Sequence, residues 1–391
     1  MTSYALCKRV RRAVAGVGVA LALCLVSVVF AGPLHQFNNN VGVNNVGGVA
    51  IDAEGGIVDL QREVRADVKE NRDRLAAEGV PEGFDGGLEL RKVSLQQLQE
   101  AIMQVRLAAG PRSLPPEIRY LAGIQRIKYI FIYPEDNDIV LAGPGEAWKI
   151  DDLGEAVGVT TGKPVVRLEN LLVAMRNAFD EDPQVISCSI DPTQEGTKRF
   201  YTFLKSFGRL KNAREVTERK DEIEEKLGPQ TVTVSGIKDT SRFAWTLVAA
   251  DYRMKKFAMG LEKSPIKGMP SFLKLMGSKT NLKNMMPRWW MEDSYDAILT
   301  DPEGLSWELR GQGVKVLTED QLIGEDGSRE RTGKVNPAAQ RWADNMTQKF
   351  DELCSADPVF GQLRNCMDLS VLAALIRTDG LHEKAGLDLE V

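Results

Sequence analysis

Residues 129–148, YIFIYPEDNDIVLAGPGEAW, constrain the fold more than any other stretch of the chain. Two nearly continuous apolar runs, 129–133 and 138–142, flank a cluster of acidic and amide residues. Such runs are typical of strands that are covered on both faces. Pro134 has no N–H group to donate to a strand ladder, so it must mark the end of the first strand. We therefore expect a central β-hairpin whose polar tip leaves the core.

The acidic tip of this hairpin has a second interpretation. Asp136 and Asp138 could hold calcium, because that ion takes several oxygen ligands from a tight loop. However, the tip lacks the twelve-residue spacing of the helix-loop-helix calcium site. Tight turns also select acidic and amide residues for conformational reasons. The pair is therefore a minor metal-site prediction, and no cofactor is predicted.

Residues 1–31 differ sharply from the rest of the chain. They carry a basic start, an uncharged apolar run at residues 13–30, and small-residue spacing at the end, Val29-Phe30-Ala31. These features predict a signal peptide that is cleaved, and thus export to the periplasm or cell envelope. The alternative is an uncleaved membrane anchor, because a run of this length can just span a bilayer.

The remaining chain divides by composition. Residues 32–47 are rich in Asn and Gly and predict a flexible lead-in. Residues 48–335 mix strand-like and helical patterns, whereas residues 336–391 are mostly helical. We expect an α+β fold: a mixed α/β core with antiparallel hairpins, and a helical C-terminal end packed on it. In the last third, DPEG and GQG are expected to be turns between antiparallel strands.

Polar residues mark five expected helix starts. Ser94 is followed by a glutamine three residues later, which is a capping-box pattern. Asp191, Asn336 and Asp357 each precede a proline, which favours the first helical position. Thr240 is expected to open a further helix.

Three of the five cysteines lie beyond residue 31: Cys188, Cys354 and Cys366. An oxidising compartment permits a disulfide, and Cys354 and Cys366 flank an expected joint between two helices. They are the possible bridged pair; the alternative is two small buried apolar residues. Cys188 lies in an apolar strand-like run and is expected in the core. No CxxC spacing occurs, so metal and redox motifs of that kind are absent.

Most established catalytic patterns are missing from the sequence. The two histidines, His35 and His382, lie in the lead-in and near the C-terminal end. The expected core therefore lacks the commonest general base and metal ligand. The GxSxG, HExxH and phosphate-binding loop motifs are also absent. No catalytic residue is assigned, and the sequence favours a non-enzymatic role without deciding the question. The alternative is an envelope hydrolase with paired carboxylates, for which the candidates are Asp191, Glu195, Asp251 and Glu146.

The best binding candidates are three aromatic residues of RWWMEDSY: Trp289, Trp290 and Tyr295. Neighbouring residues of a strand point to opposite faces, so at most one tryptophan joins the core. The other could line a carbohydrate or peptide groove, or pack at an edge against the C-terminal helices. The expected partner is an envelope protein or a cell-wall polymer, with membrane contact only if residues 1–31 are retained. Nucleic acid is not expected, because the formal net charge is −5.

Five runs resemble an uncharacterised family of exported planctomycete proteins that is defined as a domain of unknown function. The runs are GGVAIDAEG, RYLAGIQRIKYIFIYPEDNDIVLAGPGEAW, ISCSIDPTQEG, GPQTVTVSGI and LVAADYRMKKFAMGLE. The resemblance implies an exported bacterial protein and transfers no activity or site residue. Together with the residue patterns, it predicts an envelope protein of unknown function that binds or assembles with a partner.

Overall fold

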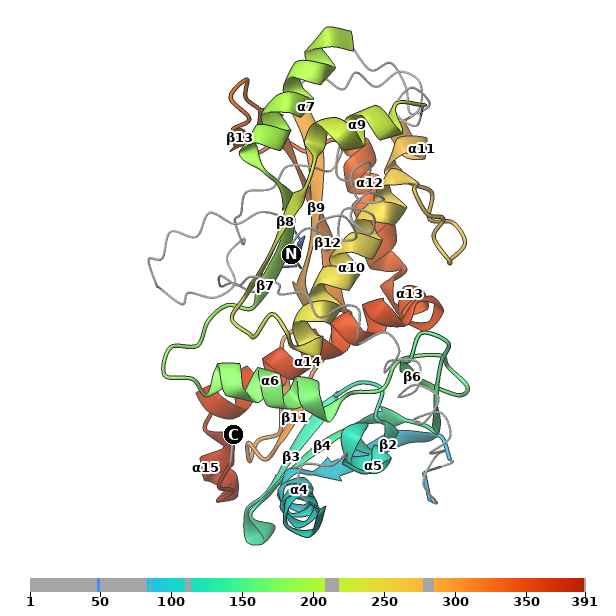
Figure 1. The fold of residues 1–391 in the computed structure, drawn as a ribbon. Coiled ribbons are helices and arrows are strands. Elements are labelled where there is room, and N and C mark those ends of the chain that lie inside the picture. The colour runs from blue at the N-terminus through green and yellow to red at the C-terminus, as the bar shows by residue number, and fades with distance from the viewer. Residues whose placement is uncertain are drawn as a thin grey trace.

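The computed structural model describes residues 48–49, 83–84, 86–109, 114–207, 218–276 and 285–389. The predicted signal peptide (1–31) and lead-in (32–47) lie outside the described residues. Within them, helices are mixed with largely antiparallel sheets (Figure 1), so the predicted α+β class is confirmed.

A five-stranded sheet forms the lower part of the molecule in Figure 1, in the order β10-β11-β3-β4-β2. Its strands are β2 (Leu88–Ser94), β3 (Tyr129–Tyr133), β4 (Asp138–Gly145), β10 (Leu299–Thr300) and β11 (Ser306–Glu308). β3 and β4 pair antiparallel, with Ile130 opposite Leu141. Both are interior strands, so the predicted central hairpin is confirmed.

The expectation that this hairpin is covered on both faces holds for most of β4, where only Val140 and Pro144 are half-buried, but not for β3. Burial alternates along β3: Ile130 and Ile132 are buried, whereas Tyr129 and Phe131 are half-buried. The buried side belongs to the main core, which also includes residues of α4 (Leu95–Ala109) and α15 (Leu381–Ala385). An apolar run containing aromatic residues is also compatible with a half-covered face, because large rings can remain partly exposed.

A six-stranded sheet forms the upper part, in the order β13-β12-β9-β1-β7-β8. Its strands are β1 (Gly48–Val49), β7 (Ser187–Pro192), β8 (Gln230–Ser235), β9 (Met285–Ser294), β12 (Gly313–Ile323) and β13 (Arg329–Arg331). One face packs on three helices, α10 (Arg242–Met259), α11 (Phe272–Met276) and α12 (Pro337–Gln348). Trp289 of β9 makes edge-on ring contacts there with Phe272 and Trp342.

Two short segments carry the chain between the sheets. Residues 295–298 lead from β9 to β10, and residues 309–312 lead from β11 to β12. They run side by side, and the Asp296 N–H donates to the Arg310 carbonyl at 3.0 Å. The expected GQG hairpin turn is therefore wrong, because this stretch joins strands of different sheets. Gly311 has φ 101°, and a Cβ there would lie 2.8 Å from the Asp296 nitrogen, so the crossing requires glycine.

The C-terminal helices pack on both parts of the molecule. They are α12, α13 (Phe350–Ala356), α14 (Pro358–Thr378) and α15. α14 contacts β12 and α10 above it and α6 (Leu168–Ala178) below it. Among the described residues, α14 alone is long and apolar enough to cross a membrane, but 72% of that stretch is buried inside the fold. It therefore occupies the position of a core helix.

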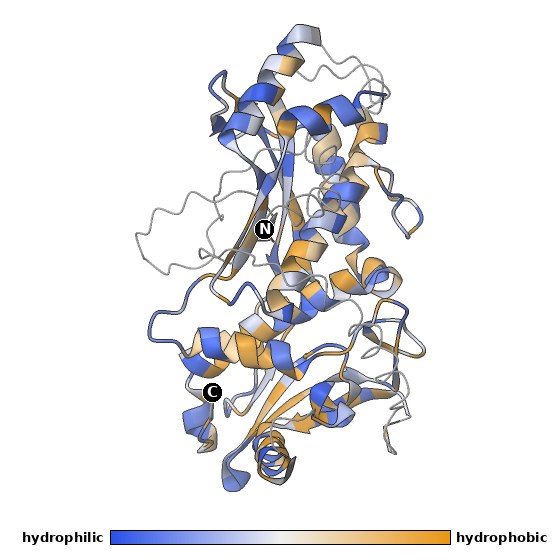
Figure 2. Ribbon diagram, in the orientation of Figure 1, coloured by the Kyte–Doolittle hydropathy of each residue, from blue (hydrophilic) through white to orange (hydrophobic). Residues whose placement is uncertain are grey.

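The remaining elements surround this framework. They are α5 (Pro116–Arg119), η1 (Leu121–Gly123), η2 (Pro134–Asp136), β5 (Trp148–Ile150), β6 (Ala156–Gly158), α7 (Gln194–Phe207) and α9 (Lys220–Leu227). β5 and β6 form a separate two-stranded sheet. Figure 2 shows apolar residues gathered in the interior strands and central helices, whereas α9 is mostly polar.

Three predicted helix caps are confirmed. Ser94 Oγ accepts from the Gln97 N–H at 3.0 Å, and Asn336 Oδ1 accepts from the Ala338 N–H at 2.9 Å. Asp357 Oδ1 accepts from the Val359 N–H at 3.4 Å.

Two predicted caps are wrong by one or two residues. β7 continues through Pro192, with Asp191 opposite Thr231 of β8. Thr193 caps α7 instead, because its hydroxyl accepts from the Gly196 N–H at 3.0 Å. The helix expected to open at Thr240 is capped by Ser241. Strand pairing overrides a local capping pattern when the ladder extends past the aspartate.

Candidate functional site

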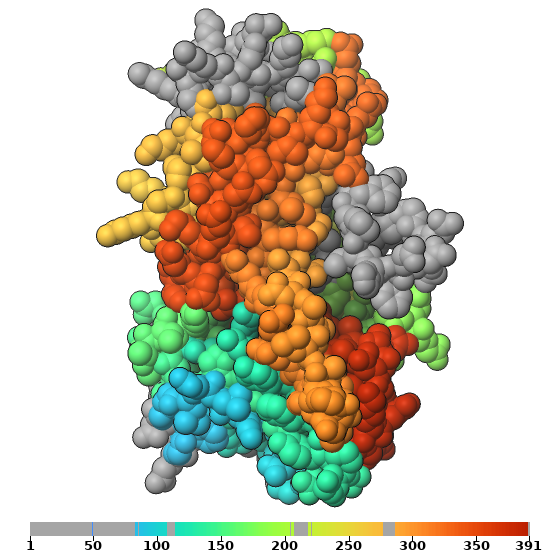
Figure 3. Space-filling view, turned by 180° about the vertical axis from the view of Figure 1, so that it is seen from behind, coloured from blue at the N-terminus to red at the C-terminus, as the bar shows by residue number. Residues whose placement is uncertain are grey.

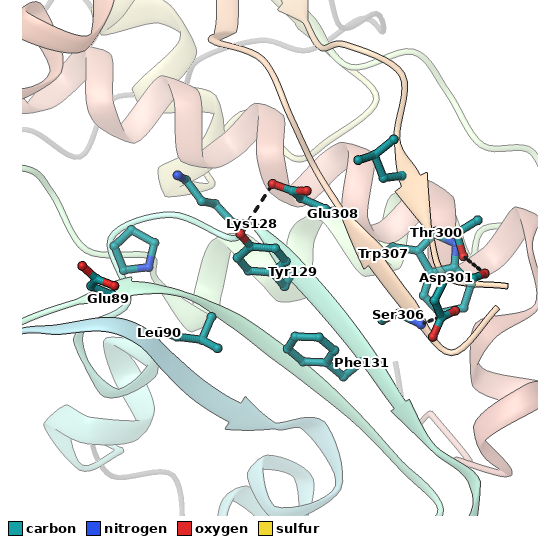
Figure 4. A pocket seen from close by; sticks show the side chains of 12 residues that line it. Glu89, Leu90, Lys128, Tyr129, Phe131, Thr300, Asp301, Ser306, Trp307 and Glu308 are labelled. Carbon is teal, nitrogen blue, oxygen red and sulfur yellow. Dashed lines mark hydrogen bonds between the residues drawn. The ribbon is translucent and has the colours of Figure 1, made fainter. Parts of the chain in front are cut away.

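A groove of about 710 Å³ lies on the half-open face of the five-stranded sheet (Figure 4). Its lining comes from all five strands and from the turn between β10 and β11. Figure 3 views the molecule from the side opposite to Figure 1 and shows this face, with β2 in blue, β3 and β4 in teal, and β10 and β11 in orange. The groove therefore crosses the sheet from edge to edge.

Strand register aligns the groove side chains in rows. Residues directly opposite one another in paired strands share a face of the sheet. Tyr129 of β3 lies opposite Glu308 of β11, and Phe131 lies opposite Ser306. Leu299 of β10 extends the first row, because it lies opposite Glu308. Pairing of segments far apart in the sequence thus builds the groove.

Two parallel aromatic rings occupy the centre of this face. The Tyr129 and Phe131 ring centroids are 6.0 Å apart, and the ring planes differ by 7°. The Tyr129 hydroxyl lies 3.5 Å from Glu308 Oε1, a contact drawn in Figure 4. The Lys92 ammonium lies 5.7 Å from the Phe131 ring centroid. The groove thus combines flat apolar surfaces with charged groups at their margins.

Polar residues surround the rings. Glu89, Lys128 and Thr300 line the groove with the residues of the two rows. Asp301 also lines it, but its Oδ1 accepts from the Leu305 N–H at 2.7 Å and therefore holds the β10–β11 turn. The groove can offer hydrogen-bond donors and acceptors around an apolar floor, as ligand-binding clefts do.

The structure separates the three predicted aromatic binding residues. Trp289 is fully buried in the core, and Trp290 is half-buried on the opposite face of the sheet. The expectation that at most one tryptophan joins the core is confirmed. The Tyr295 hydroxyl donates to Asp368 Oδ1 at 2.6 Å, where Arg126 Nε also donates to Oδ2 at 2.9 Å. None of the three lines the groove.

The two predicted calcium ligands also have different surroundings. Asp138 is buried, and its Oδ1 accepts from the Gln96 N–H at 3.0 Å, at the start of α4. Asp136 is exposed in η2. Among the described residues, no group of three or more His, Cys, Asp or Glu side chains is placed to hold a metal ion.

The four carboxylates considered for hydrolysis have different surroundings, although the charge of Asp251 acts on Asp191. Glu195 is exposed in the first turn of α7. Glu146 is buried and accepts from Gln125 and from the Thr160 and Thr161 N–H groups. Burial acts to raise its pKa, but these hydrogen bonds outweigh burial and lower the pKa below its usual value. Glu146 therefore stabilises the loop that contains Thr160 and Thr161.

The other two carboxylates have raised pKa values. Asp251 of α10 is fully buried and pairs with Lys255 at 2.7 Å. Burial raises its pKa to about 6, against the opposing charge of Lys255. Asp191 lies 3.4 Å from Arg329, and burial raises its pKa to about 6 as well. The two acids lie on different elements, and neither lines the groove.

The possible disulfide between Cys354 and Cys366 is not formed in the structure. Both residues are free thiols and are fully buried. Cys188 is also a free thiol and is nearly fully buried. Cys366 faces α6, where Asn170 Nδ2 lies 3.7 Å from its sulfur. Burial raises the pKa of Cys354 to about 11. These thiols therefore behave as small core residues.

Fold and groove define a mixed α+β protein with an aromatic cleft on a half-covered sheet. Residues 188–272 match a family described as a protein of unknown function (DUF1598). The matched region runs from β7 to the start of α11, and three of the five runs that suggested an uncharacterised family overlap it. No curated protein and no solved structure matches the chain.

The groove lies outside the matched region, and the aromatic residues predicted from the sequence as binding residues do not line it. That prediction named the adjacent tryptophans and not the residues of YIFIY. The available signal was the alternation of aromatic with aliphatic residues in 129–133, which is typical of a strand with one open face.

Proposed function

We propose that the protein is exported to the bacterial envelope and binds a cell-wall polysaccharide in the groove of the five-stranded sheet. The observation that supports this most directly is the pair of parallel rings, Tyr129 and Phe131, on the half-open face. A sugar ring has an apolar C–H face that packs on an aromatic ring, and hydroxyls that need polar partners. Glu89, Lys128 and Glu308 line the same groove and can supply them.

The direction of the groove favours a polysaccharide over an extended peptide. Peptides commonly bind a sheet by adding a strand to its edge, which gives them main-chain hydrogen bonds. This groove crosses five strands, from β2 to β10, and does not follow one free edge. Its side chains, rather than main-chain groups, must therefore provide most of the recognition.

The hydrolase alternative has weaker support. Asp251 is buried in the core, where it pairs with Lys255, and Glu146 stabilises a loop by accepting hydrogen bonds from its backbone. Glu195 and Asp191 lie near α7, on the six-stranded side of the molecule. A pair of acids facing one substrate bond is required for glycoside hydrolysis, but Asp251, whose charge acts on Asp191, is fully buried, and none of the four lines the groove.

The binding proposal is tested by co-sedimentation with purified, insoluble cell-wall polymer. The chain from residue 32 onward should be retained, and the Tyr129→Ala/Phe131→Ala variant should bind at least about tenfold more weakly. Trp245→Ala is the matched control, because Trp245 is an exposed aromatic residue of α10 (53%) that does not line the groove. Equal retention of all three proteins, or no retention of any, would contradict the proposal.

The proposal of export rests on residues 1–31 and has its own test. N-terminal sequencing of the protein from envelope fractions should begin at Gly32. Recovery of intact residues 1–31 in the membrane would instead support an uncleaved anchor.

A further inference from the structure

We propose that the second face of the six-stranded sheet contains a binding site for a small oxyanion, with Arg288 as its principal ligand. This face is opposite the one that packs on α10, α11 and α12. By strand register it carries Arg288, Glu319 and Gln321, and Arg331 lies opposite Gln321. The site is separate from the groove, which lies on the other sheet.

The sheet curls around this face. β13 and β7 are four strand spacings apart in the sheet order, which is about 19 Å in a flat sheet. Nevertheless, Arg329 Nη1 of β13 lies 3.4 Å from Asp191 Oδ1 of β7. The combined length of these two side chains is shorter than the flat spacing. The face is therefore concave, and we call it the polar trough.

Arg288 is a buried residue of the trough whose side-chain hydrogen bonds are incomplete. It is 2% exposed, yet its Nε and Nη1 atoms have no hydrogen-bond partner among the described residues. Its closest carboxylate oxygen is Glu319 Oε2, 3.7 Å from Nη2, which is longer than a hydrogen bond. Burial lowers the pKa of Arg288 to about 10, so the guanidinium is still charged at neutral pH. A buried charge without such bonds is strongly unfavourable.

Nearby groups do not satisfy Arg288. Glu319 already accepts from Arg331 Nε at 3.0 Å and from the Gly333 N–H at 3.2 Å. Gln321 is fully buried, and neither atom of its amide has a hydrogen-bond partner in the described part of the chain. Trp290 supplies only a ring face, with its centroid 4.2 Å from the Arg288 guanidinium carbon.

The charges of the trough favour an anion. Among the described residues of the trough, Arg329 pairs with Asp191, and Arg288 shares its nearest carboxylate, Glu319, with Arg331. Lys315 pairs with Glu292 at 3.6 Å on the same face, and Glu292 also accepts from Trp290 Nε1 at 2.7 Å. An oxyanion would accept from the unpaired N–H groups of Arg288 and from the Gln321 amide. Charge-assisted bonds of this kind are the strong ones in proteins.

The site is tested by thermal unfolding and calorimetric titration at constant ionic strength, with inorganic phosphate and acetate as probes against chloride. Wild type should show saturable stabilisation by at least one probe, and the two arms distinguish a phosphate ligand from a carboxylate. Arg288→Met should weaken binding at least about tenfold, the effect expected for loss of a hydrogen bond from a charged donor. Arg377→Met, at an exposed position on α14, is the matched control and should bind as wild type does.

The stability of the variants in chloride separates a ligand role from a structural one. Arg288→Met should be as stable as wild type or more stable, because it removes a buried guanidinium whose Nε and Nη1 atoms have no hydrogen-bond partner among the described residues, and so relieves its desolvation cost. If Arg288→Met does not fold, Gln321→Leu provides the second measurement, with weaker phosphate or acetate binding expected. Saturation by neither probe in wild type, or equal binding by wild type and Gln321→Leu with Arg288→Met unfolded, would overturn the proposal.

Discussion

At the residue scale, the buried ion pair of α10 shows how an isolated acid is accommodated in an apolar helix. Asp251 and Lys255 are one helical turn apart, and both are almost completely buried. Asp251 Oδ1 has no hydrogen-bond partner among the described residues, so the pair is incompletely satisfied. Such pairs contribute little net stability, but removing one partner leaves an uncompensated charge.

Lys255→Met should therefore destabilise the protein by about 3–5 kcal/mol at pH 7, because it leaves the Asp251 carboxylate buried without the ammonium that pairs with it. The double variant Asp251→Leu/Lys255→Met should recover most of that loss. Urea unfolding at pH 7 measures both. A single variant that is as stable as wild type would show that the pair is not buried as described.

The same residue predicts a pH dependence. The folded pKa of Asp251 is about 6, above the unfolded value of about 3.9. The folded state thus binds this proton more tightly, so the contribution of Asp251 is complete below about pH 4 and is lost as the pH rises through 6. Asp191 has the same sign, because its pKa is also raised to about 6. Asp251→Asn should flatten the decrease in unfolding free energy between pH 4 and pH 6; an unchanged slope would contradict the assignment.

At the element scale, the structure corrects where two helices begin. Ser241 Oγ accepts from the Ala244 N–H at 3.1 Å at the start of α10, and Thr240 lies one residue earlier, exposed. Serine and threonine are both favoured as helix caps, so the sequence alone cannot decide whether Thr240 or Ser241 caps the helix. The helix cap predicted at Asp191 is wrong for another reason, because the strand that contains Asp191 continues to pair with β8.

Adjacent substitutions test the cap of α10. Ser241→Ala should cost about 1 kcal/mol of unfolding free energy, the usual value for a lost N-cap. Thr240→Ala should change stability by less than about 0.5 kcal/mol, as exposed substitutions generally do. Chemical denaturation of the two variants checks this, and a larger effect at Thr240 would restore the prediction made from the sequence.

Periodicity predicted the elements well, but not the environments of their faces. The 129–148 hairpin and the caps at Asn336 and Asp357 follow from local patterns. The open face at Tyr129 and Phe131 depends on which distant segments cover the sheet. The same applies to Arg288, which is 2% exposed although nothing in the run RWWMEDS marks it for burial. An alternation such as that in YIFIY can mark an open face, but the identity of the distant segment that covers a face is not encoded within the strand.

At the scale of the whole molecule, one continuous core joins the two sheets. It includes Ile130 of β3, Trp289 of β9 and Leu372 of α14. Buried charges also cross between the two parts, because Asp368 of α14 binds both Arg126 and Tyr295. The two sheets should therefore not behave as independent domains.

Thermal unfolding should accordingly show a single cooperative transition. Far-ultraviolet circular dichroism and tryptophan fluorescence should give coincident curves, with equal calorimetric and van't Hoff enthalpies. Tyr295→Phe should lower the midpoint without splitting the transition, because it removes one hydrogen bond between the parts and leaves the core intact. Two resolved transitions in wild type would show that the sheets unfold separately.

The central proposal, polysaccharide binding in the aromatic groove, is tested most directly by hydroxyl-radical footprinting of the side chains. The protein would be oxidised with and without soluble fragments of cell-wall polysaccharide, and each residue measured by mass spectrometry. Tyr129, Phe131 and Leu90 line the groove and should lose reactivity when fragments bind, whereas exposed Trp245 should not change. Protection confined to Trp245 or to the six-stranded sheet, or no protection at saturating fragment, would contradict the account.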